Sequence, residues 1–225
     1  MKNIIFYVLI ILLLSCSTSE QEIVSEDVET EEEVEDIGEI ELFDMNAEFQ
    51  LLFVGNSLTQ YNNLPGLVKK IYNDTGKSVS ISTILKGGTG LEDHWNSDQL
   101  QPEINSGFYD YVIVQQGPSS QDYGRWSLLT FGGLIAESCN ENSAQLAFFM
   151  VWPSRTYYST FDGVITNYTD AAEVTNSILC PVGQVWKHHF DQTEDFSYYG
   201  PDGFHPSLKG SQVAAEVIVQ SLGIH

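Results

Sequence analysis

Basic residues are scarce in this sequence of 225 residues, which has nine Lys and Arg against 31 Asp and Glu and a formal net charge of −22. Proteins that bind nucleic acids neutralise phosphates with clustered positive charge, so this composition excludes such a partner. A long hydrophobic run is also absent, because the apolar stretch at residues 4–14 is shorter than the roughly 20 residues that a transmembrane helix needs. No repeat of about 20–50 residues is present, which excludes a solenoid or a propeller.

The N-terminus has the layout of an export signal: Lys2 precedes the apolar stretch, and Ser15 and Cys16 follow it. The sequence LLSC resembles the lipobox of bacterial lipoproteins, in which cleavage exposes a cysteine that is then lipidated. This resemblance implies a signal peptide at residues 1–15 and a lipidated Cys16, which several acyl chains hold stably in a membrane. An ordinary signal peptide with an incidental cysteine is the alternative. We therefore expect a protein of the bacterial cell envelope, facing the periplasm or the cell surface.

Acidic residues dominate the segment that follows. Residues 17–49 contain fourteen Asp or Glu and no Lys or Arg, and repulsion between such dense like charges predicts a disordered tether at residues 16–49. An anionic membrane surface would repel this tether. The remaining residues, 50–225, are enough for one domain with a substantial core.

Apolar runs alternate with helical patterns along residues 50–225, which is typical of βαβ units and a parallel sheet. We expect a three-layer α/β/α sandwich with a flavodoxin-like parallel sheet of about five strands. The predicted strands are residues 49–57, 78–85, 109–117, 144–153 and 180–186. The predicted helices are residues 64–76, 126–139, 168–179 and 207–222.

Two cysteines lie in this domain: Cys139 shortly before one predicted strand, and Cys180 at the start of another. If these strands are parallel neighbours, the thiols could meet at one edge of the sheet and form the disulfide that export permits. Two separate buried thiols are the default expectation. Neither cysteine has the features of a catalytic residue.

Polar loops follow the first three predicted strands, with the sequences GNSLT, LKGGTG and QQGPSS. The carboxyl ends of parallel strands converge on one edge, where such folds keep their active sites. Ser57 in the first loop could cap the next helix or serve as a nucleophile. The second role requires a base, an acid that orients the base, and donors for an oxyanion.

A base and an acid occur together in the sequence DGFHPS, just before the last predicted helix. Asp202 and His205 are three residues apart, so Asp202 can bond one imidazole nitrogen while the other nitrogen faces a serine. A serine hydroxyl becomes a useful nucleophile only when an adjacent base accepts its proton. A surface histidine beside a turn-forming Asp-Gly is the alternative for this loop.

The combination of GNSLT near the start and DGFHPS near the end resembles the SGNH family, the GDSL-type esterases and lipases. This resemblance implies the nucleophile Ser57, the base His205 and the orienting acid Asp202. It spans residues 51–222, and Asn56 stands where the family often has Asp. The Gly-x-Ser-x-Gly pattern of α/β-hydrolases is absent at this serine.

The oxyanion hole departs from the family pattern, because no asparagine follows Gly117 in the third block. The resemblance implies that the N–H groups of Ser57 and of a glycine in the second block donate to the oxyanion. Gly88 is the expected glycine, and Gly87 is the alternative. We expect the Gln116 amide to replace the asparagine, with Ser119 as the alternative, because QQGPS is similar to a stretch of the sialate O-acetylesterase and acetylxylan esterase branch.

Several further residues are candidates for the substrate rim: Asn56, Gly87, His94, Ser119 and Trp152. For His94, which follows Glu92 and Asp93, a structural or rim role is favoured over a metal site, because no second ligand is spaced to match. Aromatic residues in loop-like segments could stack on sugars or only pack at the rim. These are Trp95, Tyr123, Trp126, Trp152, Tyr157, Tyr158, Tyr198 and Tyr199.

The sequence thus predicts a lipid-anchored serine esterase that needs no metal and no cofactor. The expected substrate is a glycan or small-molecule ester with a short acyl group, because the resemblance is to a branch that removes acetyl groups from carbohydrates. Two alternatives stay open: a carbohydrate-binding protein that has lost turnover, and a lipase or thioesterase for long acyl chains.

Overall fold

The computed structural model describes residues 43–224. The predicted signal peptide, Cys16 and most of the predicted tether lie outside these residues. Residues 43–48 form a turn in front of the first strand, and the Asp44 N–H donates to Ser80 Oγ at 3.0 Å. The described chain therefore already contacts the sheet before residue 50.

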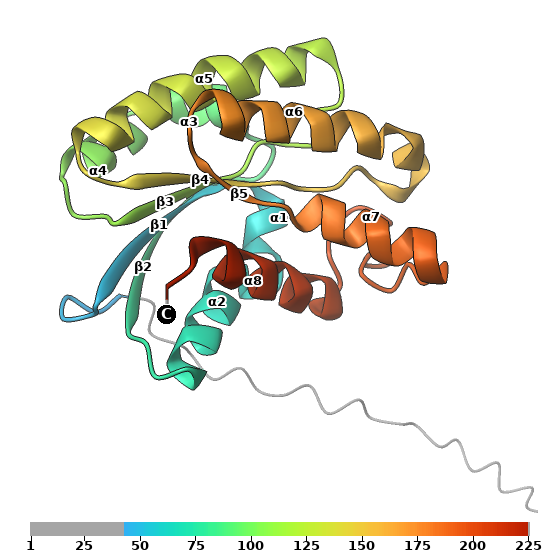
Figure 1. Ribbon diagram of the computed structural model, residues 1–225, viewed down its shortest axis with the longest axis horizontal. Coiled ribbons are helices and arrows are strands. Elements are labelled where there is room, and N and C mark those ends of the chain that lie inside the picture. The colour runs from blue at the N-terminus through green and yellow to red at the C-terminus, as the bar shows by residue number, and fades with distance from the viewer. Residues whose placement is uncertain (1–42, 225) are drawn as a thin grey trace, which may run out of the picture. The chain divides into compact units, whose positions relative to one another are not determined.

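Five parallel strands form one sheet in the order β2-β1-β3-β4-β5 (Figure 1). The inner strand β1, between β2 and β3, is Phe49–Gly55, where residues 50–55 are all buried, as expected for a parallel strand that is covered on both faces. The other strands are β2 (Val79–Leu85), β3 (Tyr111–Val114), β4 (Gln145–Phe149) and β5 (Ile178–Cys180). This arrangement confirms the predicted flavodoxin-like sheet.

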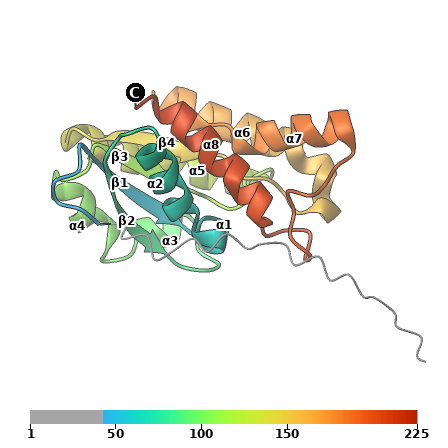
Figure 2. The ribbon, with the colours of Figure 1, turned by 90° about the horizontal axis from the view of Figure 1, so that it is seen from below.

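Helices cover both faces of the sheet, which gives the predicted three layers. One face carries α2 (Leu64–Asp74) and α8 (Leu208–Leu222), which lie side by side (Figures 1 and 2). The other face carries α5 (Asp122–Glu141) and α6 (Phe161–Val174), together with the short helices α3 (Leu91–Trp95) and α4 (Leu100–Asn105). No helix within residues 43–224 is long and apolar enough to cross a membrane.

The segment after β5 differs from the prediction. Residues 180–186 were expected to form the last strand, but β5 ends at Cys180 and α7 spans Val182–Thr193. Pro181 lacks an N–H, so it cannot extend the ladder. From there Val182, Trp186 and Phe190 recur every four residues and form the buried side of a helix.

The two cysteines are free thiols, and both are fully buried. Cys139 lies near the end of α5, before β4 begins, whereas Cys180 pairs with Phe149 at the carboxyl end of β4. The two thiols therefore belong to opposite ends of the strands, which excludes the disulfide considered above. Burial raises the pKa of each thiol to about 12, so neither is a thiolate near neutral pH.

Candidate active site

The strand order reverses between β1 and β3, and ligands of such sheets bind at the carboxyl ends of these two strands. Ser57 follows β1 and is the first residue of the short helix α1 (Ser57–Gln60). Asn56, rather than Ser57, caps this helix, because its Oδ1 accepts the Leu58 N–H at 3.0 Å. The serine side chain is thus left free of the capping role.

The Ser57 hydroxyl meets the side chain of His205, which lies 148 positions later in the sequence. Ser57 Oγ and His205 Nε2 are 3.0 Å apart, and His205 Nδ1 and Asp202 Oδ2 are 2.5 Å apart. The other Asp202 oxygen accepts the N–H groups of Phe204 and His205 at 2.9 Å each. The hydrogen bond with His205 is the main cause of the lowered pKa of Asp202. The structure thus brings together Ser57, His205 and Asp202, which the sequence analysis expects to be the nucleophile, the base and the orienting acid.

Buried polar side chains hold the turn around Ser57. Gln115 Oε1 accepts both the Asn56 N–H and the Thr59 hydroxyl at 3.0 Å. His94 is 3 % exposed, and its Nε2 lies 3.0 Å from the Gly55 carbonyl oxygen at the end of β1. Burial is the main cause of the lowered pKa of His94, which favours the neutral ring.

The loop that carries His205 is held by hydrogen bonds that its backbone carbonyl groups accept from other parts of the protein. Trp152 Nε1 donates to the Phe204 carbonyl at 2.9 Å, and the Arg155 N–H donates to the Gly203 carbonyl at 2.8 Å. The Tyr61 ring stacks on the imidazole of His205, with centroids 4.1 Å apart and planes 11° apart. Tyr61 therefore covers one face of the ring from a position four residues after Ser57, and the sequence analysis missed this contact.

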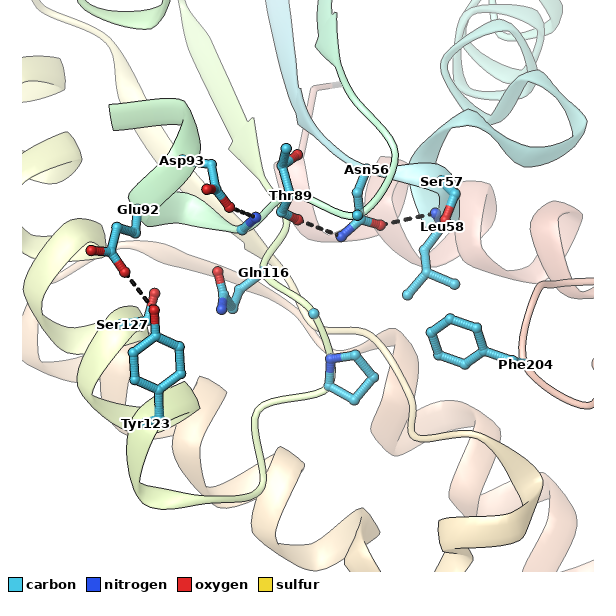
Figure 3. Close-up of a pocket in the computed structure, with 14 residues that line it drawn as sticks. Asn56, Ser57, Leu58, Thr89, Glu92, Asp93, Gln116, Tyr123, Ser127 and Phe204 are labelled. Carbon is cyan, nitrogen blue, oxygen red and sulfur yellow. Dashed lines mark hydrogen bonds between the residues drawn. The ribbon is translucent and has the colours of Figure 1, made fainter. Parts of the chain in front are cut away.

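A hollow of about 360 Å³ opens beside Ser57 and is called the Ser57 cleft here. Figure 3 shows the Gln116 side chain between the acidic residues of α3 and the turn at Ser57. The residues that line it are Asn56, Ser57, Leu58, Gly88, Thr89, Gly90, Glu92, Asp93, Gln116, Gly117, Pro118, Tyr123, Ser127 and Phe204. Gly88 and Gln116 thus share one cleft with the serine, as the predicted oxyanion hole requires.

The Gln116 amide has a fixed orientation. Its Oε1 accepts the Leu91 N–H at 2.6 Å, and within the described residues no hydrogen bond reaches its Nε2. A Cβ at Gly90 would lie 2.5 Å from Gln116 Oε1, so a larger residue there would displace the amide from this orientation. The backbone carbonyl of Gln116 is held by the Tyr168 hydroxyl. The result is a pre-oriented N–H₂ donor at the cleft.

The far wall of the Ser57 cleft is polar and acidic. Tyr123 on α5 donates to Glu92 Oε2 on α3 at 2.5 Å, and this hydrogen bond is the main cause of the raised pKa of Tyr123. Asp93 accepts the Gly90 N–H at 2.8 Å. The Ser127 hydroxyl is buried at this wall without a protein partner among the described residues. No lysine or arginine lines the cleft.

Four of the residues expected at the substrate rim do not line the Ser57 cleft: Gly87, His94, Ser119 and Trp152. His94, Ser119 and Trp152 are almost fully buried, so these side chains pack inside the protein and do not reach the rim of this cleft. Ser119 Oγ donates to the Gly117 carbonyl instead, and Trp152 stacks on Trp186. Trp152, Tyr198 and Tyr199 are buried, whereas Tyr123, Trp126 and Tyr157 are exposed. Within residues 43–224, no three His, Cys, Asp or Glu side chains gather as metal ligands would.

No protein-family model matches this chain, and no curated protein sequence matches it. Solved structures do match. A candidate SGNH hydrolase from Slackia heliotrinireducens has a TM-score of 0.64 and 21% identity, covering 78% of this chain and 99% of its own. A lipase/acylhydrolase from Enterococcus faecalis has a TM-score of 0.64 and 14% identity, covering 77% of this chain and 95% of its own.

A variant of Axe2, an acetyl xylan esterase from Geobacillus stearothermophilus, has a TM-score of 0.57 and 16% identity, covering 80% of this chain and 96% of its own. These identities are low, so the likeness establishes the fold. The chain has the α/β fold of the SGNH hydrolases.

Proposed function

We propose that this protein is a serine esterase of the SGNH type that hydrolyses carboxylic esters through Ser57, His205 and Asp202. The observation that carries this proposal is the continuous line of contacts from Ser57 Oγ to His205 Nε2 and from His205 Nδ1 to Asp202. Nucleophilic catalysis by a serine needs this order of groups. The low-identity structural neighbours, which include lipases and acetyl xylan esterases, support the same reaction class.

The reaction begins when Ser57 Oγ attacks the ester carbonyl carbon and its proton passes to His205 Nε2. Asp202 accepts the hydrogen bond from Nδ1–H and stabilises the imidazolium. Collapse of the tetrahedral intermediate expels the alcohol oxygen, which takes the proton from Nε2. Water then attacks the acyl-enzyme through the same base, and the acid leaves.

The negative charge that develops on the carbonyl oxygen needs donors. We assign this role to the N–H groups of Ser57 and Gly88 and to Gln116 Nε2. The free Nε2, with Oε1 fixed by Leu91, supports Gln116 as the side-chain donor. Each such donor contributes about 3–4 kcal/mol to the stabilisation of a transition state in comparable sites.

The proposed substrate carries a short acyl group, acetyl above all, on a carbohydrate. A long apolar chain in the Ser57 cleft would cover Glu92, Asp93 and the unpaired Ser127 hydroxyl without satisfying them, and burial of such polar groups is unfavourable. The proposal that the alcohol half is a carbohydrate rests on the structural neighbour that is an acetyl xylan esterase. We further propose that Cys16 is lipidated and anchors the enzyme in the cell envelope.

Hydrolysis of p-nitrophenyl acetate, with labelling by a fluorophosphonate probe, tests the reaction. We expect labelling at Ser57 and a kcat at least about 10³-fold lower in Ser57→Ala. A wild-type protein that is no faster than Ser57→Ala would indicate a binding protein without turnover. A series from acetate to octanoate tests the acyl preference, and activity that rises with chain length would overturn it. Loss of fatty-acid labelling in Cys16→Ser tests the anchor.

A further inference from the structure

A second hollow, called the Tyr157 hollow here, adjoins the Ser57 cleft and has a volume of about 550 Å³. Pro118 and Phe204 line both hollows and form the boundary between them. Phe204 comes directly before His205, and their rings are 5.1 Å apart. Figure 3 shows Phe204 on the same side of the view as Ser57 and Leu58, opposite Glu92 and Tyr123. The Tyr157 hollow is therefore continuous with the site of the proposed chemistry, on the side of the base.

The walls of the Tyr157 hollow differ in chemistry from the Ser57 cleft. Pro118, Pro153, Tyr157 and Phe204 supply apolar faces, and no charged residue lines it. Polar groups that line the hollow include Gln121 and Ser154. Tyr157 is 66 % exposed, so its ring is available to a ligand. An aromatic surface with a few amide and hydroxyl groups is the usual composition of a site for an uncharged organic ligand.

The segments that form the Tyr157 hollow are fixed to their neighbours. The Tyr199 hydroxyl donates to the Pro153 carbonyl at 2.7 Å, and the Arg155 N–H donates to the Gly203 carbonyl at 2.8 Å. Asn167 of α6 donates to the Ser119 carbonyl at 2.7 Å and holds the loop after Pro118. Because these bonds join groups of the protein itself, the hollow is pre-formed and a ligand need not order it.

The chemistry decides which half of an ester enters this hollow. The alcohol oxygen must receive a proton from His205 Nε2, whereas the carbonyl oxygen must point toward Gly88 and Gln116. The alcohol therefore leaves past the loop of His205, and the next wall on that side is Phe204. The acyl group is left in the Ser57 cleft.

We propose that the Tyr157 hollow is the subsite for the alcohol half of the substrate and that this half is an uncharged sugar ring. The inference rests on the esterase function proposed above. The C–H face of the sugar stacks on Tyr157 and Phe204, and its hydroxyl groups bond Gln121 and Ser154. An anionic sugar is disfavoured because no cation lines either hollow and because Glu92 and Asp93 line the Ser57 cleft.

Two ester series test the subsite. One series keeps acetate and changes the alcohol from ethanol to an acetylated methyl xyloside and to an acetylated sialic acid. The other keeps ethanol and lengthens the acyl group from acetate to octanoate. Tyr157→Ala removes the exposed ring, Tyr157→Phe restores it, and Ser154→Trp fills the hollow. Phe43→Ala is the matched control, because Phe43 is an exposed aromatic residue that contacts Phe108 near the amino ends of the strands.

For wild-type protein, we expect kcat/KM to be higher for the xyloside acetate than for ethyl acetate and for the sialic acid ester. Tyr157→Ala and Ser154→Trp should each lower the xyloside-to-ethyl ratio about fivefold to tenfold, mainly through KM. Tyr157→Phe and Phe43→Ala should keep the wild-type ratio.

An unchanged ratio in Tyr157→Ala and Ser154→Trp, in an enzyme that hydrolyses ethyl acetate, would overturn the subsite and leave the esterase intact. A loss confined to the octanoate ester would make the hollow an acyl pocket and also overturn the proposal. If wild type hydrolyses no ester faster than Ser57→Ala, the proposed function itself fails.

Discussion

The two loops that meet at Ser57 and His205 are supported in different ways. The turn at Ser57 is built into the core, where the side chain of Gln115, 1 % exposed, bonds both Asn56 and Thr59. The loop of His205 lies at the surface, and the side chain of Asp202 is half exposed. There the support comes from side chains and N–H groups that donate to backbone carbonyls, such as Trp152 to Phe204.

This difference separates the consequences of substitution. A buried side chain that loses its partner is costly, so changes beside Ser57 should reduce stability together with activity. An exposed ion pair contributes little to stability, and an amide at position 202 keeps an acceptor for the Phe204 and His205 N–H groups, so Asp202→Asn should reduce activity with little loss of stability. The predictions below test this contrast.

Asp202→Asn should have the largest effect on turnover, lowering kcat by about 10⁴-fold because the neutral amide neither fixes the tautomer nor stabilises the imidazolium. Thermal unfolding should stay close to wild type. Asp195→Asn is a matched control, because Asp195 also contacts a histidine, His189, at 3.3 Å and is also partly exposed. Equal losses of kcat in the two variants would contradict the assigned role.

Gln116→Glu should lower kcat by about 10²–10³-fold with a smaller change in KM. The carboxylate keeps an acceptor for the Leu91 N–H, so the loop should stay in place, but it removes the N–H₂ donor and adds an opposing charge. Steady-state kinetics on p-nitrophenyl acetate measure the change. A kcat near the wild-type value would show that Gln116 is not the oxyanion donor.

Gln115→Leu should lower the free energy of unfolding by about 2–4 kcal/mol, because the Asn56 N–H and the Thr59 hydroxyl both lose their acceptor. Urea unfolding measures this loss, and kcat should fall in the same variant as the turn at Ser57 loosens. Gln184→Leu is the control, because Gln184 is an exposed glutamine on α7. A fully stable Gln115→Leu would contradict the idea that buried polar groups hold the turn.

Trp152→Phe should lower the free energy of unfolding by about 1–2 kcal/mol, since one hydrogen bond to the Phe204 carbonyl is lost while an aromatic ring remains beside Trp186. The loop of His205 should become more mobile, and kcat should fall by less than in Asp202→Asn. Hydrogen exchange at residues 203–205 reports the loop directly. Unchanged exchange there would show that the remaining backbone bonds suffice.

His94→Gln should have the smallest effect, visible in the pH dependence of stability. Burial lowers the pKa of His94 below 6.5, so below that pH the unfolded chain binds a proton that the folded chain resists. The stability that the neutral ring of His94 contributes to the fold is therefore present above pH 6.5 and is lost as the pH falls below that value. Urea unfolding should show that the free energy of unfolding falls more from about pH 7.5 to about pH 5.5 in wild type than in His94→Gln. Equal losses of stability in the two proteins would contradict the assigned role of His94 as a buried neutral ring.

Local patterns predicted the parts of the fold and site that depend on neighbours in the sequence. Alternating apolar runs gave the parallel sheet, and the spacing of Asp202 and His205 gave their contact. The hydrogen bonds that hold the two loops in place could not be predicted in this way. The bond from Trp152 to Phe204 joins residues 52 positions apart, and α7 was missed because its apolar residues are few and follow directly on β5.

The sizes of residues 90 and 116 depend on each other, because a methyl group at Gly90 would collide with the amide of Gln116. The long side chain of Gln116 therefore occupies volume that a Cβ at position 90 would otherwise fill. A larger residue at position 90 would consequently push this amide out of its orientation, and an engineer who wishes to enlarge position 90 without moving the amide must shorten residue 116 in the same step.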